Sequence, residues 1–171
     1  VSWDRLCEIA SAYEQNWDLA IRLWNIDIRE TKLIATKICS PEMLNEKNIY
    51  EWISGINNSE LAEITSILFA KNITLTKKYI ELLHDANFYI RLSMLHTLSK
   101  IGMNLNEKEI EEIIKSINIS DTDNISAARA IESILLTADI KGQKEITTEF
   151  TKILSQTKTT YSEYICKSLN Y

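Results

Sequence analysis

Apolar residues recur every three or four positions along most of the chain, which is the spacing of one face of an α-helix. In the segment Asp18–Ile38, one such stripe ends at Trp24, a polar turn follows, and a second stripe runs from Ile28 to Ile38. Two short antiparallel helices of this kind cannot bury all of their apolar surface alone. The pattern therefore predicts that further helix pairs pack against this one.

Comparable segments follow along the whole chain, separated by short polar stretches. The predicted helices span 3–13, 18–24, 28–38, 45–53, 61–70, 74 or 76 to 84, 88–101, 106–116, 125–138, 144–154 and 161–171. Asn45, Asn87 and Asn106 are expected to cap the helices that follow them, and Asp121 or Asp123 is expected to open the helix at 125–138.

Helix pairs that return every ~35–45 residues are typical of HEAT or armadillo-like repeats. We therefore predict an all-α fold, an α-α superhelix that forms a curved solenoid, with residues 1–171 as a single domain. A globular helix bundle is the alternative. Because the chain begins at Val1 and ends at Tyr171 inside a predicted helix, we expect it to be truncated at both ends.

Composition agrees with a helical fold, since 171 residues with only 3 Gly and 1 Pro supply few of the turns that a β-rich domain needs. No apolar run is long enough to cross a bilayer, so we expect a cytoplasmic protein without membrane contact. Cys7, Cys39 and Cys166 are far apart and predict reduced thiols. His84 and His96 lack the spacing of a zinc site, and we expect no metal and no cofactor.

The charged residues give a mixed indication about partners. A formal net charge of −5 counts against a nucleic-acid partner, although a basic stripe can coexist with acidic outer faces. In a solenoid, helices on the concave side could align basic residues along DNA. The candidates for such phosphate contacts are Lys71, Lys77, Lys78, Arg91, Arg129 and Lys167.

Several stretches of the sequence are similar to the sequences of one protein family. They are Leu23-Trp24, Glu30, Leu33 to Ala35, Pro41, Asn48 to Trp52, Leu68 to Lys71, Phe88 to Arg91 and Glu163 to Tyr171. In these stretches the chain resembles the AlkD-like DNA alkylation repair proteins, which are DNA glycosylases built from HEAT-like repeats. The resemblance touches most of the chain, and its most specific part runs from Asp18 to Lys71.

The resemblance implies binding of alkylated duplex DNA in a concave groove and excision of N3- or N7-alkylpurines. In the family, a carboxylate and two aromatic side chains face the sugar of the damaged nucleotide. The family's Trp-Asp-x-x-Asp signature is not retained, because the matching segment reads Asn57-Asn58-Ser59-Glu60-Leu61-Ala62-Glu63. The family's catalytic Asp falls at Ala62 or Glu63, depending on a one-residue gap. Glu63 is then the candidate catalytic carboxylate and Tyr171 the candidate aromatic wall, and excision would be weak or lost.

A second interpretation comes from a different class of protein. Solenoids often bind protein or peptide partners along their groove without any chemistry. The missing signature and the acidic balance favour such a non-catalytic scaffold. We expect a monomer in either case, with DNA or a protein as its partner. A continuous basic stripe on the concave face would support DNA, whereas an apolar or acidic groove would support a protein.

Overall fold

Helices make up the regular structure of residues 1–169, the part of the chain that the computed structural model describes, and no strand occurs in this range. The α-helices are α1 (Trp3–Ser11), α2 (Trp17–Trp24), α3 (Arg29–Ile38), α4 (Ile49–Ile53), α5 (Ser59–Phe69), α6 (Thr76–Glu81), α7 (Phe88–Ile101), α8 (Glu107–Ser116), α9 (Ile125–Ile140), α10 (Lys144–Thr157) and α11 (Ser162–Ser168). Short 3-10 helices cover Pro41–Met43, Ile73–Leu75, Leu82–His84, Gly102–Asn104 and Ile119–Asp123. The predicted all-α class is confirmed.

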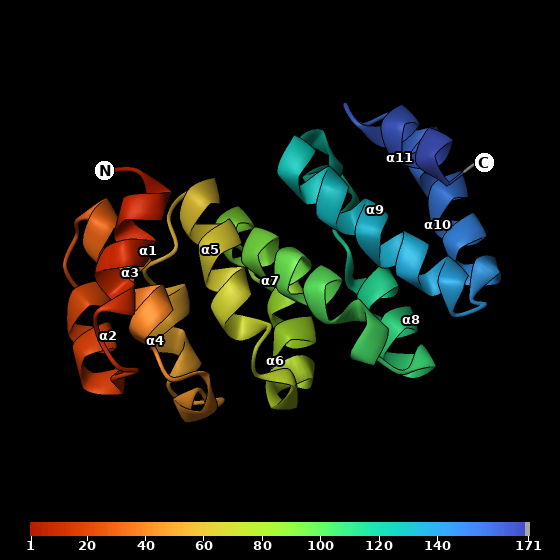
Figure 1. The fold of residues 1–171 in the computed structure, drawn as a ribbon. Helices are drawn as coiled ribbons and strands as arrows, with labels where there is room; N and C mark the ends of the chain where they lie inside the picture. Colours follow the sequence, from red (N-terminus) through yellow and green to blue (C-terminus); the bar gives the residue numbers. More distant parts are fainter. Residues whose placement is uncertain (170–171) are drawn as a thin grey trace.

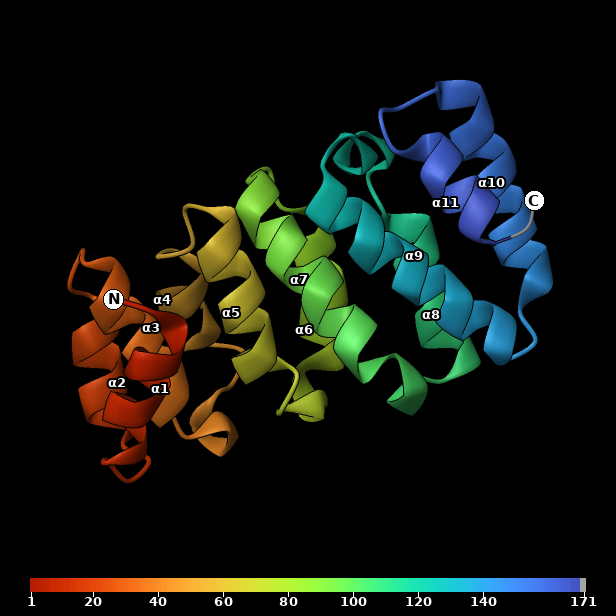
Figure 2. The ribbon, with the colours of Figure 1, turned by 45° about the horizontal axis from the view of Figure 1, so that its top comes forward.

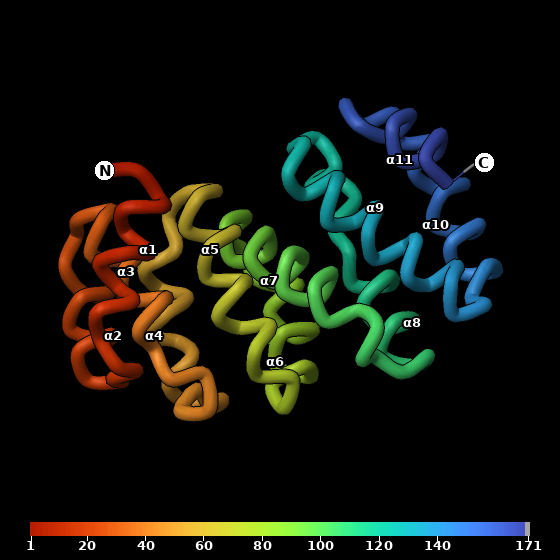
Figure 3. Tube along the Cα trace, viewed as in Figure 1, coloured from red at the N-terminus to blue at the C-terminus, as the bar shows by residue number. Residues whose placement is uncertain are grey.

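The helices lie in two rows that run from one end of the molecule to the other (Figures 1 and 2). The odd row consists of α3, α5, α7, α9 and α11, each packed against the next. The even row consists of α4, α6, α8 and α10, which lie behind the odd row in Figure 1, while α1 and α2 pack against α3. The Cα trace shows the N-terminus and the last described residues at opposite ends (Figure 3). From α3 to α11, each loop carries the chain from one row to the other.

Asparagine side chains start many of these helices. Asn58, Asn87 and Asn106 each accept a hydrogen bond from a backbone N–H in the first turn of α5, α7 and α8. Asn106 forms a complete capping box with Glu109. Because such caps satisfy N–H groups that no intrahelical carbonyl can reach, these starts follow from local sequence.

Three residues that were expected to begin helices do not do so in the structure. Asn45 shapes a turn, accepting hydrogen bonds from the N–H groups of Lys47 and Asn48, so α4 begins later at Ile49. Asn124, rather than Asp121 or Asp123, caps α9. Asp121 and Asp123 lie in the preceding 3-10 helix, and their carboxylates bond to residues of other segments.

The buried core is continuous along the described chain and fills the space between the two rows. Trp24 and Trp52 each end an apolar helical stripe, a position that predicts a core residue, and both are almost fully buried in the structure. Gly55 allows this packing, because a Cβ at its position would come within 2.5 Å of Nε1 of Trp24. Cys39 is a buried free thiol, and burial raises its pKa to about 12.

Candidate functional site on the odd row

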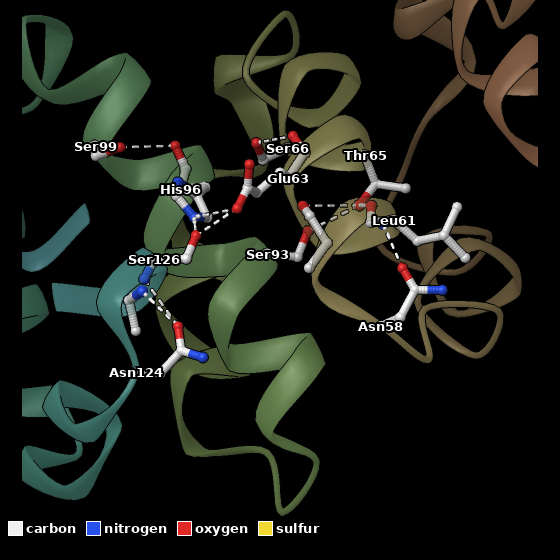
Figure 4. Close-up of polar contacts among 12 residues, drawn as sticks. Asn58, Leu61, Glu63, Thr65, Ser66, Ser93, His96, Ser99, Asn124 and Ser126 are labelled. Atoms are coloured by element: carbon white, nitrogen blue, oxygen red, sulfur yellow. Dashed lines mark hydrogen bonds and ion pairs between the residues drawn. The ribbon is translucent and has the colours of Figure 1, made fainter. Parts of the chain in front are cut away.

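Glu63, the carboxylate that the sequence singled out, lies near the middle of α5 in the odd row. The side chain of Glu63 is 49% exposed. Its Oε1 accepts a hydrogen bond from the hydroxyl of Ser126 at 2.5 Å and lies 3.9 Å from Nε2 of His96 (Figure 4). The structure thus holds one oxygen of this carboxylate while leaving the group open to solvent.

Three neighbouring helices of the odd row contribute to this site. Glu63 comes from α5, His96 from α7 and Ser126 from the first turn of α9, and their side chains point toward one another in Figure 4. The Ser126 hydroxyl lies 2.8 Å from Nε2 of His96, so it bridges the imidazole and the carboxylate. We call Glu63, His96 and Ser126 the bridging cluster.

The electrostatic surroundings keep His96 neutral near pH 7. Its side chain is 13% exposed, and burial together with the charge of Lys100 lowers its pKa to about 4. The nearby carboxylate of Glu63 opposes this lowering, and it likewise opposes the lowering of the pKa of Lys100 by burial. A neutral imidazole cannot form an ion pair with Glu63, so their contact is made through the Ser126 hydroxyl.

No local motif in the sequence groups these three residues, and His96 and Ser126 were not predicted as part of a site. Their spacing carries a weak indication that could have found them. His96 and Ser126 are 30 residues apart, and Glu63 and Ser126 are 63 residues apart, which corresponds to one and two helix pairs. Residues separated by whole helix pairs come side by side in stacked repeats.

The predicted phosphate contacts fall into different settings. Arg129 is exposed in the odd row, on the same helix as Ser126, and acts on the pKa of Tyr164 in α11. Lys167 is also exposed, but pairs with Glu163 at 3.1 Å. The structure therefore places Arg129 and Lys167 toward one end of the row and does not bring them next to Glu63.

Lys71, Lys77 and Lys78 lie after α5 and in α6, which belongs to the even row. Lys71 and Lys77 are exposed. Lys78 pairs with Glu81 at 2.6 Å and lies over the ring of Tyr50, and these contacts raise its pKa to about 12.

Arg91 has the most protein contacts of the predicted basic residues. Its guanidinium donates to both carboxylate oxygens of Asp121, at 2.9 and 2.6 Å, and to the backbone carbonyls of Asp85 and Ala86. The side chains of Arg91 and Asp121 are only 12% and 3% exposed. A guanidinium bound in this way has a structural role, so Arg91 is left out of the proposed interface below.

The remaining prediction, Tyr171, lies outside the described residues.

Two further features of the described residues bear on where a functional site could lie. No helix in residues 1–169 is long and apolar enough to cross a membrane. A hollow of about 400 Å³ lies along α8 and α10, where Glu111, Lys115 and Glu149 line it. No residue of the bridging cluster and none of the predicted site residues lines this hollow.

Comparison of the chain with family models, with curated proteins and with solved structures gives no match. The resemblance described in the sequence therefore rests on the quoted residues alone.

Proposed function

We propose that the protein is a divergent member of the AlkD-like DNA alkylation repair family, built as an α-α superhelix of HEAT-like repeats. The repeat architecture is supported by contacts that recur at similar spacing. Asn72 donates to the carbonyl of Pro41, 31 residues away, and Lys141 donates to the carbonyls of Met103 and Leu105, 38 and 36 residues away. In both places a polar side chain that follows one odd-row helix binds the segment that follows the previous one.

In this proposal, alkylated duplex DNA lies along the odd row, and Glu63 faces the deoxyribose of the damaged nucleotide. The observation that carries the proposal is the position of Glu63, which is central, about half exposed and held by Ser126. An N3- or N7-alkylpurine is a cationic leaving group, and its loss leaves positive charge on the sugar. A fixed carboxylate can stabilise that charge in the transition state.

We expect DNA affinity to be modest. The exposed cations on the helices of the odd row are Arg29, Lys37, Lys100, Arg129 and Lys167. Arg29 pairs with Glu60 and Lys167 with Glu163, and the whole chain has a formal net charge of −5. Few phosphate contacts mean little counterion release, so binding should require low salt and show a shallow dependence on salt concentration.

The test is release of methylated purine from duplex DNA that has been treated with a methylating agent. Wild type would be compared with Glu63→Gln, which keeps the shape and removes the charge, and with Glu112→Gln as a matched control. Glu112 is an exposed carboxylate on α8 in the even row. We expect release by wild type and by Glu112→Gln, and at least a tenfold lower rate with Glu63→Gln, about 1.4 kcal/mol of transition-state stabilisation.

Equal rates for wild type and Glu63→Gln would remove Glu63 from the mechanism. If no variant releases purine, glycosylase activity is absent, and a DNA-binding titration at low and high salt then tests the remaining part of the proposal. Binding that weakens with salt, and weakens at all salt concentrations in Arg129→Ala, would support a DNA-binding protein without excision.

One observation favours a second candidate, a non-catalytic scaffold for a protein partner. Helices of the odd row expose the large apolar side chains of Ile67 in α5, of Ile125, Leu136 and Ile140 in α9, and of Tyr164 in α11. Exposed apolar side chains are typical of protein-binding surfaces where they form one contiguous patch. Absence of DNA binding even at low salt would favour this candidate over the first.

A further inference from the structure

The hydrogen-bond chain in the bridging cluster has a direction. The hydroxyl of Ser126 has one proton, which it donates to Oε1 of Glu63 at 2.5 Å. The hydroxyl oxygen of Ser126 also lies 2.8 Å from Nε2 of His96. Because its only proton is already donated to Glu63, this oxygen can only accept a hydrogen bond from His96. The proton of a neutral imidazole must therefore be on Nε2, and the chain runs from His96 through Ser126 to Glu63.

The chain fixes only one end of the carboxylate. Both contacts that the described residues make with this side chain, from Ser126 and from the vicinity of His96, involve Oε1. Because the Glu63 side chain is 49% exposed, Oε2 is left for water or a ligand. The charge of Lys100 is close enough to interact with Glu63. No lysine or arginine among the described residues forms an ion pair with this carboxylate, so its exposed oxygen keeps both its orientation and its charge.

The supporting residues are themselves held by the helices. Ser126 lies in the first turn of α9, where its N–H donates to the side chain of Asn124. His96 lies in α7 between buried neighbours, with a side chain that is 13% exposed. Rigid supports of this kind hold a functional group in one geometry and make its position depend on how the helices pack.

We infer that Ser126 and His96 are positioning residues that hold Oε1 of Glu63 and direct Oε2 toward the reacting sugar. The substrate in this inference rests on the proposed function, but the hydrogen-bond chain belongs to the free protein and can be tested without DNA. Two charged groups act on the pKa of the His96 imidazole: Lys100 lowers it and Glu63 raises it.

The first test is NMR of the free protein with ¹⁵N-labelled histidine at pH 7. We expect His96 to be neutral with its proton on Nε2, and we expect Ser126→Ala to shift its ring nitrogens. Ser126→Thr retains the hydroxyl and should restore the ring-nitrogen signals of the wild type. Ser133→Ala, on the same helix, is the control that should leave these signals unchanged.

The second test applies if the protein excises alkylpurines. Ser126→Ala should lower the single-turnover rate about tenfold or more while DNA affinity stays unchanged, because misplacement of the carboxylate affects the transition state more than binding. His96→Gln, whose amide can still donate to Ser126, should retain more activity than His96→Leu. Thermal unfolding of each variant separates this effect from loss of the fold.

A proton on Nδ1 of His96, or ring signals that Ser126→Ala leaves unchanged, would overturn the inference. That result does not depend on excision. Conversely, the expected NMR signals in a protein that releases no purine would refute the glycosylase proposal and leave the hydrogen-bond chain standing. The two failures are therefore distinguishable.

Discussion

Neighbouring helices are joined differently in two regions of the molecule. At the N-terminal end, α2 and α4 meet through aromatic side chains. The ring of Trp52 lies 4.9 Å from that of Trp24 and 6.2 Å from that of Trp17, measured between centroids. Nε1 of Trp24 also donates to the carbonyl of Glu51. Large rings bury much apolar area, and apart from this one hydrogen bond they constrain the relative position of the two helices through shape.

In the middle of the molecule, polar side chains connect α5, α7 and α9 in addition to apolar packing. The Thr65 and Ser93 hydroxyls are 3.0 Å apart in the core, and Arg91 binds Asp121 through two hydrogen bonds. Because buried polar groups need specific partners, such contacts allow fewer arrangements than rings do. The candidate site lies where these directional contacts fix three helices relative to one another.

The largest effect in this comparison should come from the aromatic region. We expect Trp24→Ala to lower the free energy of unfolding by about 4–5 kcal/mol, since Trp24 is 2% exposed and its loss leaves a cavity beside Trp52. Urea denaturation followed by circular dichroism would measure it. Trp3→Ala is the control, because Trp3 is only partly buried, and a similar loss there would contradict the special weight given to Trp24.

A somewhat smaller loss should follow from Asp121→Ala in the polar region. We expect a cost of about 3 kcal/mol, because the substitution leaves the guanidinium of Arg91 without its buried partner. Arg91 retains two backbone carbonyls, which limits the loss. The same denaturation experiment applies.

Two further variants sharpen the result for Asp121. A double variant, Arg91→Met with Asp121→Leu, should recover much of the stability, because it removes both charges together. Glu111→Ala breaks a solvent-exposed pair with Lys115 and should change little. A double variant that is less stable than Asp121→Ala would mean that the ion pair itself, rather than the stranded charge, supplies the stability.

Those features of the fold that depend on residues close together in the chain could be predicted from the sequence. The number and order of the helices and the caps at Asn87 and Asn106 follow from periodicity and from residues within one turn, and the structure confirms them in the described residues, although several helix ends are shifted. The expected burial of Trp24 and Trp52 is confirmed for the same reason, since each ends an apolar stripe.

The sequence could not predict which polar residues pair across helices. Arg91 was expected to contact phosphate because its charge is visible in the sequence, whereas its partner Asp121 is 30 residues away. His96 and Ser126 were missed in the same way. Such pairs depend on the register between stacked helices, which packing of the whole core determines.

The smallest expected effect is on the pH dependence of the free energy of unfolding, to which His96 in the polar region contributes. Burial lowers the pKa of His96 to about 4 in the folded protein, below the 6.5 of an unperturbed histidine. Between these values the unfolded chain binds a proton that the folded protein does not, so His96 makes stability fall as pH is lowered from 6.5 to 4. The full shift corresponds to on the order of 3 kcal/mol as an upper limit, reached only below pH 4. Near pH 5.5 the loss of stability should be about 1 kcal/mol.

Urea denaturation of wild type and His96→Gln at pH 7.5 and 5.5 would measure this loss, with His84→Gln as the control because His84 is exposed. We expect the wild type to lose more stability than His96→Gln between the two pH values, and His84→Gln to behave like the wild type. Equal losses in all three would show that His96 is not held neutral by its surroundings, and the polar region would then be no more sensitive to acid than the aromatic one.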